Sequence, residues 1–280
     1  MKMLQTILTV TLCGAIFAVA ASASAQPTQN GYATVVRVQG GASYSLGDGV
    51  THALVAGKLL PAGATIYTSD SGVVDVVLGK KVVFPQSSGA PDRISAAPDA
   101  PVRGLTSIQP ATQQNVVRLT PNSTLVIDKL TTTDTGADTV SDTELDLQKG
   151  KIYASVKKLS ATSQYLVKIP NGVAGVRGTK FSISADGSTA VFETSSSGLV
   201  ITLSGPNGTQ SYTIAAGQML DPVSGVVSIP ADAQSNLGNL FSALATTYKM
   251  TFSYDKSNNV FTFVSPTTGD QGGSAPLPPI

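Results

Sequence analysis

Few side chains in this sequence have the type and spacing that catalysis requires. His52 is the only histidine. A Ser-His-Asp site needs only one histidine, but the chain has no Gly-x-Ser-x-Gly nucleophile elbow. A zinc site would lack a second histidine, and Cys13, the only cysteine, lies in an apolar N-terminal stretch. We therefore expect His52 to be an exposed turn residue and the chain not to be an enzyme.

The acidic residues are a second place to look for chemistry. Four of them could gather around calcium, which prefers clustered oxygen ligands: Asp134, Asp138, Asp142 and Glu144. Their spacing lacks the EF-hand pattern, and Glu144 alternates along a strand as a solvated sheet face would. Pairs such as Asp70 and Asp75 could serve a glycosidase, but no tryptophan is present to stack a sugar. We predict no catalytic, cofactor or metal site.

The most distinctive motif is NGVAGVRGTKF, residues 171–181. Gly175 and Gly178 flank Arg177, so the backbone on both sides of the cation can approach a neighbour closely. Thr179 leads into Phe181, on the apolar face of an alternating strand. These five residues are either a partner-contact motif or a structural one. In the structural interpretation, which the glycines favour, the Arg177 guanidinium satisfies backbone carbonyls or a carboxylate at a turn between strands.

The N-terminus has the pattern of a secretory leader. Leu4 to Ala21 is apolar, Lys2 is the only charge before Arg37, and small residues follow at 23–25. We predict a signal peptide over residues 1–25, the alternative being an uncleaved membrane anchor. The whole chain has 18 Lys and Arg and 17 Asp and Glu, so removing Lys2 leaves 17 − 17 = 0. An uncharged chain has no electrostatic attraction for nucleic acid, and we expect a periplasmic or secreted protein with no transmembrane span after cleavage.

The elements that must position these residues are β-strands. Short valine-rich runs recur between Gly, Asn and Asp turns, and only 12% of residues are charged. This rhythm predicts a mainly β fold of many short strands, as either a sandwich or a twisted β-helix. Residues 85–114, with five prolines, are interpreted as an inserted loop, and Thr131 to Asp142 as another polar loop.

The C-terminal part has a different pattern. From about Ala231 to Tyr248, apolar residues at spacings of three and four predict one amphipathic helix. Two strands follow, Met250 to Tyr254 and Val260 to Val264, so that residues 231–264 form a small helix-plus-two-strand unit. We expect the apolar face of the helix to pack on its own domain rather than on a partner helix. Residues 265–280, rich in Pro and Gly, are expected to be a disordered tail.

The ordered motifs resemble a known family. LVAGKLLPAGATIYTSDSGVVDVVL, ELDLQKGKIYASV and YLVKIPNGVAGVRGTKFSIS follow one another as in the FecR domain, the periplasmic part of bacterial cell-surface signalling regulators. The resemblance covers residues 33–217. It implies a non-enzymatic β-rich module, a twisted β-helix, that makes protein contacts. Only Met1, Lys2 and Met3 precede the apolar run, so we expect this chain to lack the cytoplasmic anti-sigma segment of signalling members.

The resulting functional prediction is an exported FecR-like module that binds a protein partner in the periplasm or at the cell surface. Because we expect no anti-sigma segment, the resemblance alone does not establish a role in envelope signalling, and that role stays open. The alternative is a structural component of the cell envelope that binds peptidoglycan or another polysaccharide. Fractionation, partner capture and co-sedimentation with cell-wall material would separate these interpretations.

Overall fold

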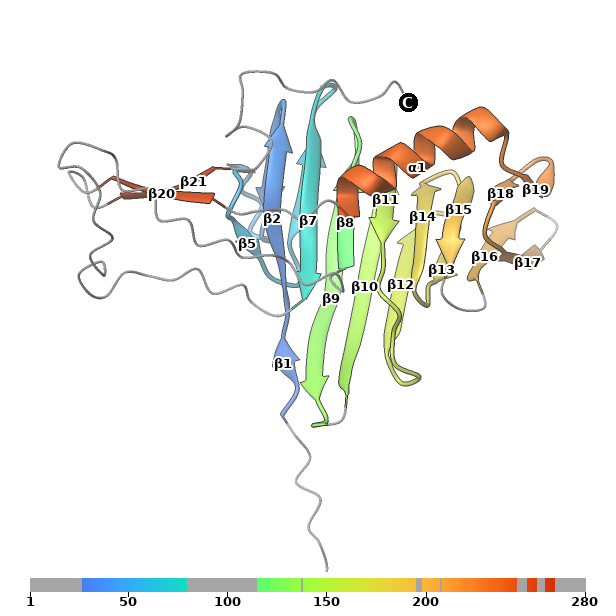
Figure 1. Ribbon diagram of the computed structural model, residues 1–280, viewed down its shortest axis with the longest axis horizontal. Helices are drawn as coiled ribbons and strands as arrows, with labels where there is room; N and C mark the ends of the chain where they lie inside the picture. Colours follow the sequence, from blue (N-terminus) through green and yellow to red (C-terminus); the bar gives the residue numbers. More distant parts are fainter. Residues whose placement is uncertain are drawn as a thin grey trace, which may run out of the picture.

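The computed structural model describes residues 27–79, 115–136, 138–194, 198–206, 208–245, 251–255 and 260–264. The predicted leader, the whole proline-rich loop and the C-terminal tail lie outside these residues. Within the described part the chain folds into a ten-stranded sheet, a nine-stranded sheet, a separate two-stranded sheet and one helix (Figure 1). The prediction of a mainly β fold with one C-terminal helix is confirmed.

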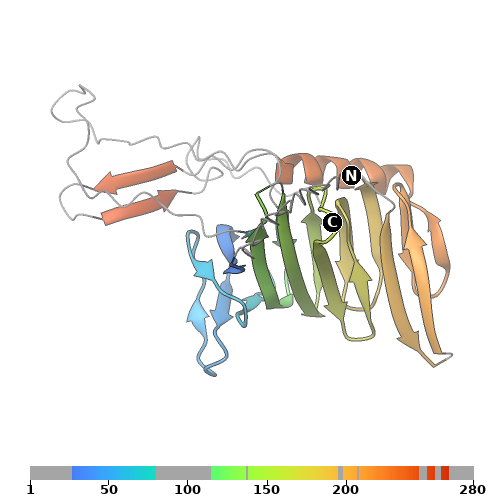
Figure 2. The same cartoon turned by 90° about the horizontal axis from the view of Figure 1, so that it is seen from below.

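The two large sheets, called sheet A and sheet B below, face each other as two layers (Figure 2). Sheet A has the order β17 (Gly208–Ile214), β16 (Leu199–Gly205), β13 (Gly172–Gly175), β12 (Gln164–Ile169), β10 (Thr139–Lys149), β9 (Thr124–Asp134), β6 (Thr65–Thr68), β3 (Ala42–Ser45) and β4 (His52–Ala53), with β1 (Gln29–Asn30) beside β9. Sheet B has the order β19 (Gly225–Ser228), β18 (Gln218–Asp221), β15 (Thr189–Thr194), β14 (Thr179–Ser184), β11 (Lys151–Ser155), β8 (Asn115–Leu119), β7 (Val73–Gly79), β2 (Tyr32–Gln39) and β5 (Leu59–Leu60).

The chain passes back and forth between the sheets as it advances along them. From β12 onward it visits each sheet in hairpins: β12–β13 in sheet A, β14–β15 in sheet B, β16–β17 in sheet A and β18–β19 in sheet B. Neighbouring strands are antiparallel, except that β10 and β12 are parallel. The fold is therefore a two-layer sandwich in which the chain alternates between the layers as it advances. It combines the two layers of the predicted sandwich with the progressive winding of the predicted β-helix.

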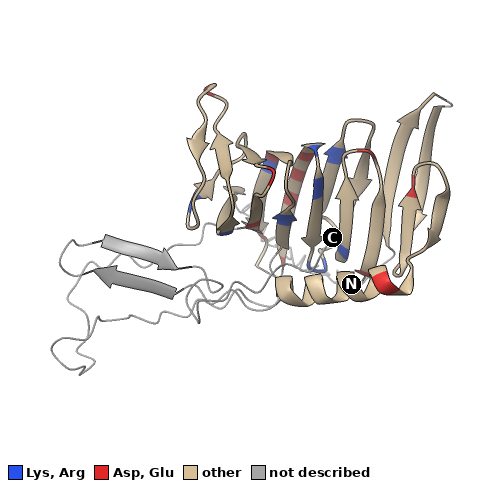
Figure 3. Ribbon diagram, turned by 90° about the horizontal axis from the view of Figure 1, so that it is seen from above, with Lys and Arg blue, Asp and Glu red and all other residues tan. Residues whose placement is uncertain are grey.

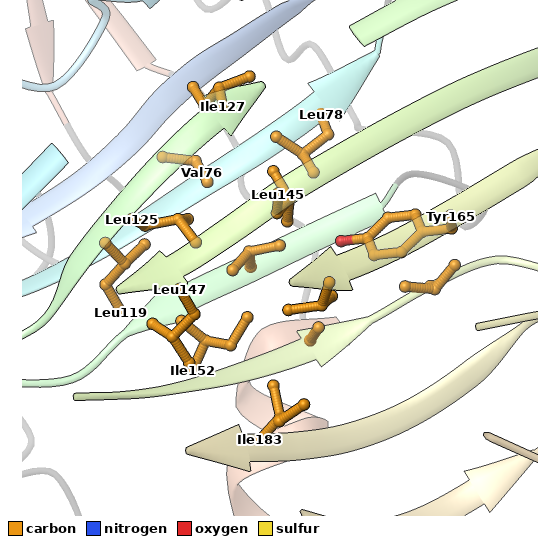
Figure 4. Packing of buried hydrophobic residues seen from close by; sticks show 14 of the residues in the cluster. Val76, Leu78, Leu119, Leu125, Ile127, Leu145, Leu147, Ile152, Tyr165 and Ile183 are labelled. Carbon is orange, nitrogen blue, oxygen red and sulfur yellow. The ribbon is translucent and has the colours of Figure 1, made fainter. Parts of the chain in front are cut away.

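The core fills the space between the sheets. Alternate residues of each strand point inward, as the two-residue period of a strand requires. From sheet A, Leu125 and Leu145 are fully buried, and they face Val76 and Ile152 of sheet B across the interior (Figure 4). Tyr165 is 1% exposed, and burial raises the pKa of its phenol above the usual value.

The predicted polar loop between Thr131 and Asp142 is wrong. β9 continues to Asp134 and β10 begins at Thr139, so only a short turn separates two long paired strands. The reason is that threonine and serine occupy inward positions here: Thr132, Ser141 and Thr143 are 6%, 9% and 1% exposed. A β-branched threonine fits a pleated strand as well as valine does, although it reads as polar in sequence.

The C-terminal helix, α1 (Ala231–Ala245), lies across the outer face of sheet B (Figures 1 and 2). Its buried residues Leu240, Phe241 and Leu244 pack on that face, where Phe241 stacks on Phe192 at 5.5 Å between ring centroids. The predicted packing of the helix on its own domain is confirmed. Strands β18 and β19 carry sheet B on to Ser228, beyond the predicted limit at residue 217.

The remaining strands, β20 (Thr251–Asp255) and β21 (Val260–Val264), form an antiparallel pair, as the sequence pattern predicted. Among the described residues, no helix is long and apolar enough to cross a membrane. The apolar N-terminal run lies outside those residues.

Candidate interaction surfaces

The motif at residues 171–181 is a crossover between the two sheets. β13 ends at Gly175 in sheet A and β14 begins at Thr179 in sheet B, so the three residues between them change layer. Gly178 has a φ of 77°, in the left-handed region that glycine adopts without steric cost. The Val176 amide donates to the Tyr165 carbonyl at 2.9 Å, which ties the crossover to β12. This geometry explains why a glycine follows the arginine.

Arg177 and Phe181 point to different surroundings. Arg177 is exposed, and its Nη1 donates to the Ala161 carbonyl at 3.1 Å. Phe181 is fully buried between the sheets, and Thr179 is 1% exposed. Gly175 sits where a Cβ would be 3.9 Å from its nearest neighbours, an ordinary contact distance. Arg177 thus makes the backbone-carbonyl contact that the structural interpretation requires, while its exposure leaves it reachable by a partner.

The histidine lies in the two-residue edge strand β4 of sheet A, and not in a turn as predicted. His52, in β4, has a side chain 46% exposed, and its Nε2 is 4.0 Å from an Asp48 carboxylate oxygen. The centroid of its ring lies 5.3 Å from the centroid of the Tyr44 ring. The Lys58 ammonium lies over the same Tyr44 ring, 4.8 Å from its centroid. No serine hydroxyl contacts His52 among the described residues, so this part of the chain does not assemble a Ser-His-Asp arrangement.

The four acidic residues considered for calcium do not come together. Asp134 and Asp138 hold the β9–β10 turn, where each carboxylate accepts a hydrogen bond from a nearby backbone amide. Asp142 and Glu144 lie farther along β10 and pair with Lys129 and Lys168 respectively. The described residues contain no group of three or more His, Cys, Asp or Glu that could hold a metal ion.

These pairs belong to a charged patch on the outer face of sheet A, visible as red and blue bands across the central strands in Figure 3. Lys168 in β12 contacts Glu144 at 2.8 Å and Asp128 at 3.1 Å. Hydrogen bonds to these two carboxylates raise the pKa of Lys168 to about 12. The lysine is 43% exposed, so each pair is screened by solvent and contributes little to stability. The patch is a solvated face.

A buried charge cluster was missed by the sequence reasoning. Asp75, fully buried on the outer face of sheet B, accepts hydrogen bonds from Arg118 Nε at 2.7 Å and Arg118 Nη2 at 2.8 Å. Arg37 Nη1 lies 3.7 Å from the same carboxylate. The register places the three residues side by side on β2, β7 and β8. The available signal was a single charge inside each apolar run, VVDVV and NVVRL, which a solvated strand face would not show.

The free edges of the sheets differ in length. At one end of the sandwich, the edge strands β4 and β5 have two residues each. At the other end, β17 has seven residues and β19 has four. β17, with the sequence GTQSYTI, carries neither charge nor proline, the usual devices that protect an edge from pairing. It is the longest of these four edges.

Together these features define a class: a two-layer β module stabilised by a large apolar core, with a long open edge and no assembled catalytic cluster among its described residues. Residues 108–199 match the family described as FecR protein. The resemblance to the FecR domain is therefore confirmed over that segment, which contains the Gly175–Phe181 motif.

Similar solved structures were also found. Two crystal structures of a proposed anti-sigma factor from Parabacteroides distasonis align with 13% and 14% identity and TM-scores of 0.28 and 0.29. The alignments cover 43% and 52% of this chain and 53% and 62% of those chains, so this chain spans little more than half of their length. No curated protein matches the chain.

Proposed function

We propose that this chain is an exported, non-enzymatic FecR-like module that binds a protein partner in the periplasm or at the cell surface and acts in envelope signalling. The FecR match over residues 108–199 supports a regulatory role at a coarse level. The leader-like N-terminus supports export. The observation that carries partner binding is the open edge of sheet A at β17.

The register of β17 determines which of its backbone groups are available. Gly208 pairs with Gly205 across a two-residue turn, and pairing continues to Ile214 opposite Leu199. In an antiparallel hairpin, alternate residues direct both N–H and C=O toward the partner strand, and the others direct them away. Ser204, on the neighbouring strand, follows this rule, because its amide donates to Asn171 on the far side of β16.

By the same alternation, Thr209, Ser211 and Thr213 direct their backbone groups outward. An extended segment of a partner can therefore add to sheet A beside β17, with main-chain hydrogen bonds providing affinity. Gly208 to Ser211 and Thr213 are exposed, so side chains on this edge are also accessible. A partner bound in this way would present an extended, uncharged strand.

The test is a proline placed at an outward position. Ser211→Pro removes one outward N–H while leaving the bonds to β16, and proline is tolerated at edge positions whose N–H faces solvent. Ser211→Ala keeps the N–H and is the matched control. Partners are captured by mild cross-linking in cells that express each variant, and thermal unfolding is followed by circular dichroism.

We expect Ser211→Ala to capture the same partner as the unchanged protein and Ser211→Pro to lose it, with similar melting temperatures. Equal capture by both variants would remove β17 from the proposal. Co-sedimentation of the protein with purified peptidoglycan, without any captured protein, would favour the envelope-polymer alternative. Recovery of the chain in the cytoplasmic fraction would contradict export.

A further inference from the structure

A groove of about 210 Å³ lies between α1 and the outer face of sheet B. Its floor is one row of side chains, because the register places Tyr153 opposite Ser182, Ser182 opposite Ala190, and Ala190 opposite Met219. Ser182 and Ala190 are small, so they leave space under the helix that larger side chains would fill. The helix supplies the wall from one stripe of residues: Ala233, Asn236, Leu237 and Leu240.

The groove has polar groups at one end. Lys151 lines it, and the Lys151 ammonium lies 5.0 Å from the centroid of the Tyr153 ring. Within the described residues no carboxylate pairs with Lys151, whereas Lys168 and Lys180 both have acidic partners. Ser182 is 3% exposed and lines the same groove, opposite Tyr153 on the neighbouring strand. A cation and a buried hydroxyl donor thus face the same apolar space.

We propose that this groove binds a linear aliphatic carboxylate of about eight carbons. Its carboxylate accepts hydrogen bonds from Lys151 and Ser182, and its chain lies over Ala190 toward Met219, beneath Leu237. The groove volume of about 210 Å³ is roughly seven times the ~30 Å³ that one water occupies in the liquid. It therefore suits a chain of about seven carbons beyond the carboxylate group. The positive charge of Lys151 selects an anionic head, and the apolar floor and wall select an unbranched chain.

The neighbouring arginine does not compete for the ligand. Arg118 is the residue beside Tyr153 on the other side of the same row. Its guanidinium is engaged by the Asp75 carboxylate through two hydrogen bonds. The anion is therefore directed to Lys151, at the end of the groove.

The test uses octanoate, at concentrations where it is monomeric, with the full purified chain carrying ¹³C-labelled methyl groups. We expect octanoate to shift the methyl resonances of Met219 and Leu237. Lys151→Met keeps an apolar stem and removes the charge, so it should weaken octanoate binding about tenfold, the usual effect of losing a charged hydrogen bond. Lys149→Met, an exposed lysine outside the groove, is the matched control and should bind as the unchanged protein does.

Two further measurements complete the test. Ala190→Leu fills the floor, and we expect it to abolish the octanoate shifts while the circular dichroism spectrum stays unchanged. Octyltrimethylammonium carries the same chain with a cationic head, and we expect it to bind at least tenfold more weakly than octanoate. The proposal is overturned if octanoate shifts neither methyl group, if both lysine variants weaken binding equally, or if the cationic probe binds as well as octanoate.

Discussion

The buried carboxylate of Asp75 should be among the most sensitive polar positions in the molecule. Asp75→Asn keeps the size of the side chain and removes the negative charge that Arg118 and Arg37 both contact. Asp75 is fully buried, and the side chains of Arg118 and Arg37 are only 4% and 8% exposed. Removing one member of a buried ion pair typically costs about 3–5 kcal/mol, because the remaining charges stay desolvated.

That loss is a large part of the total stability of a domain, which is about 5–15 kcal/mol. The assay is urea unfolding followed by far-ultraviolet circular dichroism, since the chain has no tryptophan to report by fluorescence. Asp70→Asn is the matched control, because Asp70 is exposed in a turn of the same region and should change stability by less than about 0.5 kcal/mol. A cost below about 1 kcal/mol for Asp75→Asn would refute the reasoning.

Three further predictions use the same unfolding assay. Arg177→Ala removes one exposed hydrogen bond to a carbonyl and should cost about 1 kcal/mol; unchanged stability with loss of partner capture would instead assign Arg177 to the partner surface. Gly150→Ala should cost clearly more than Gly136→Ala: both glycines have φ near 80°, but only at Gly150 would a Cβ lie 2.2 Å from the Ser123 hydroxyl oxygen, adding about 1–3 kcal/mol of overpacking. Equal costs for the two substitutions would show that Ser123 moves away from the added Cβ without strain. Burial raises the pKa of Tyr165 above 10.0, so the unfolded chain ionises first and stability should fall as the pH rises above 10; Tyr165→Phe should remove that part of the pH dependence, and an unaltered profile would contradict it.

The sequence predicted the class of fold because two of its signals are local. Turn residues separate the strands, and alternation marks their inward faces, so both signals can be recognised within a single short run such as the valine-rich β7. Local signals failed where composition misled. The threonine-rich ends of β9 and β10 were interpreted as a loop, and β18 and β19, separated by a turn that contains Pro222, were not recognised.

The candidate surfaces depended instead on pairing between distant strands. Arg118 and Asp75 are 43 residues apart, and no period in the sequence indicates that they are neighbours. The same holds for the five residues of the 171–181 motif: their spacing predicted a tight connection, but only the fold shows that this connection changes from one sheet to the other.

One row across sheet B joins the buried charges to the groove. The register runs from Arg37 through Asp75 and Arg118 to Tyr153, and then through the groove floor to Met219. A shift of one residue in the pairing of β7 with β2 or β8 would turn charged side chains toward the apolar core. The charges would then lose their present hydrogen bonds, and burying a charge without them is costly. The Asp75 cluster therefore helps to specify the register on one side of Tyr153. If this is correct, Asp75→Asn should also weaken octanoate binding in the groove, although Asp75 does not line it.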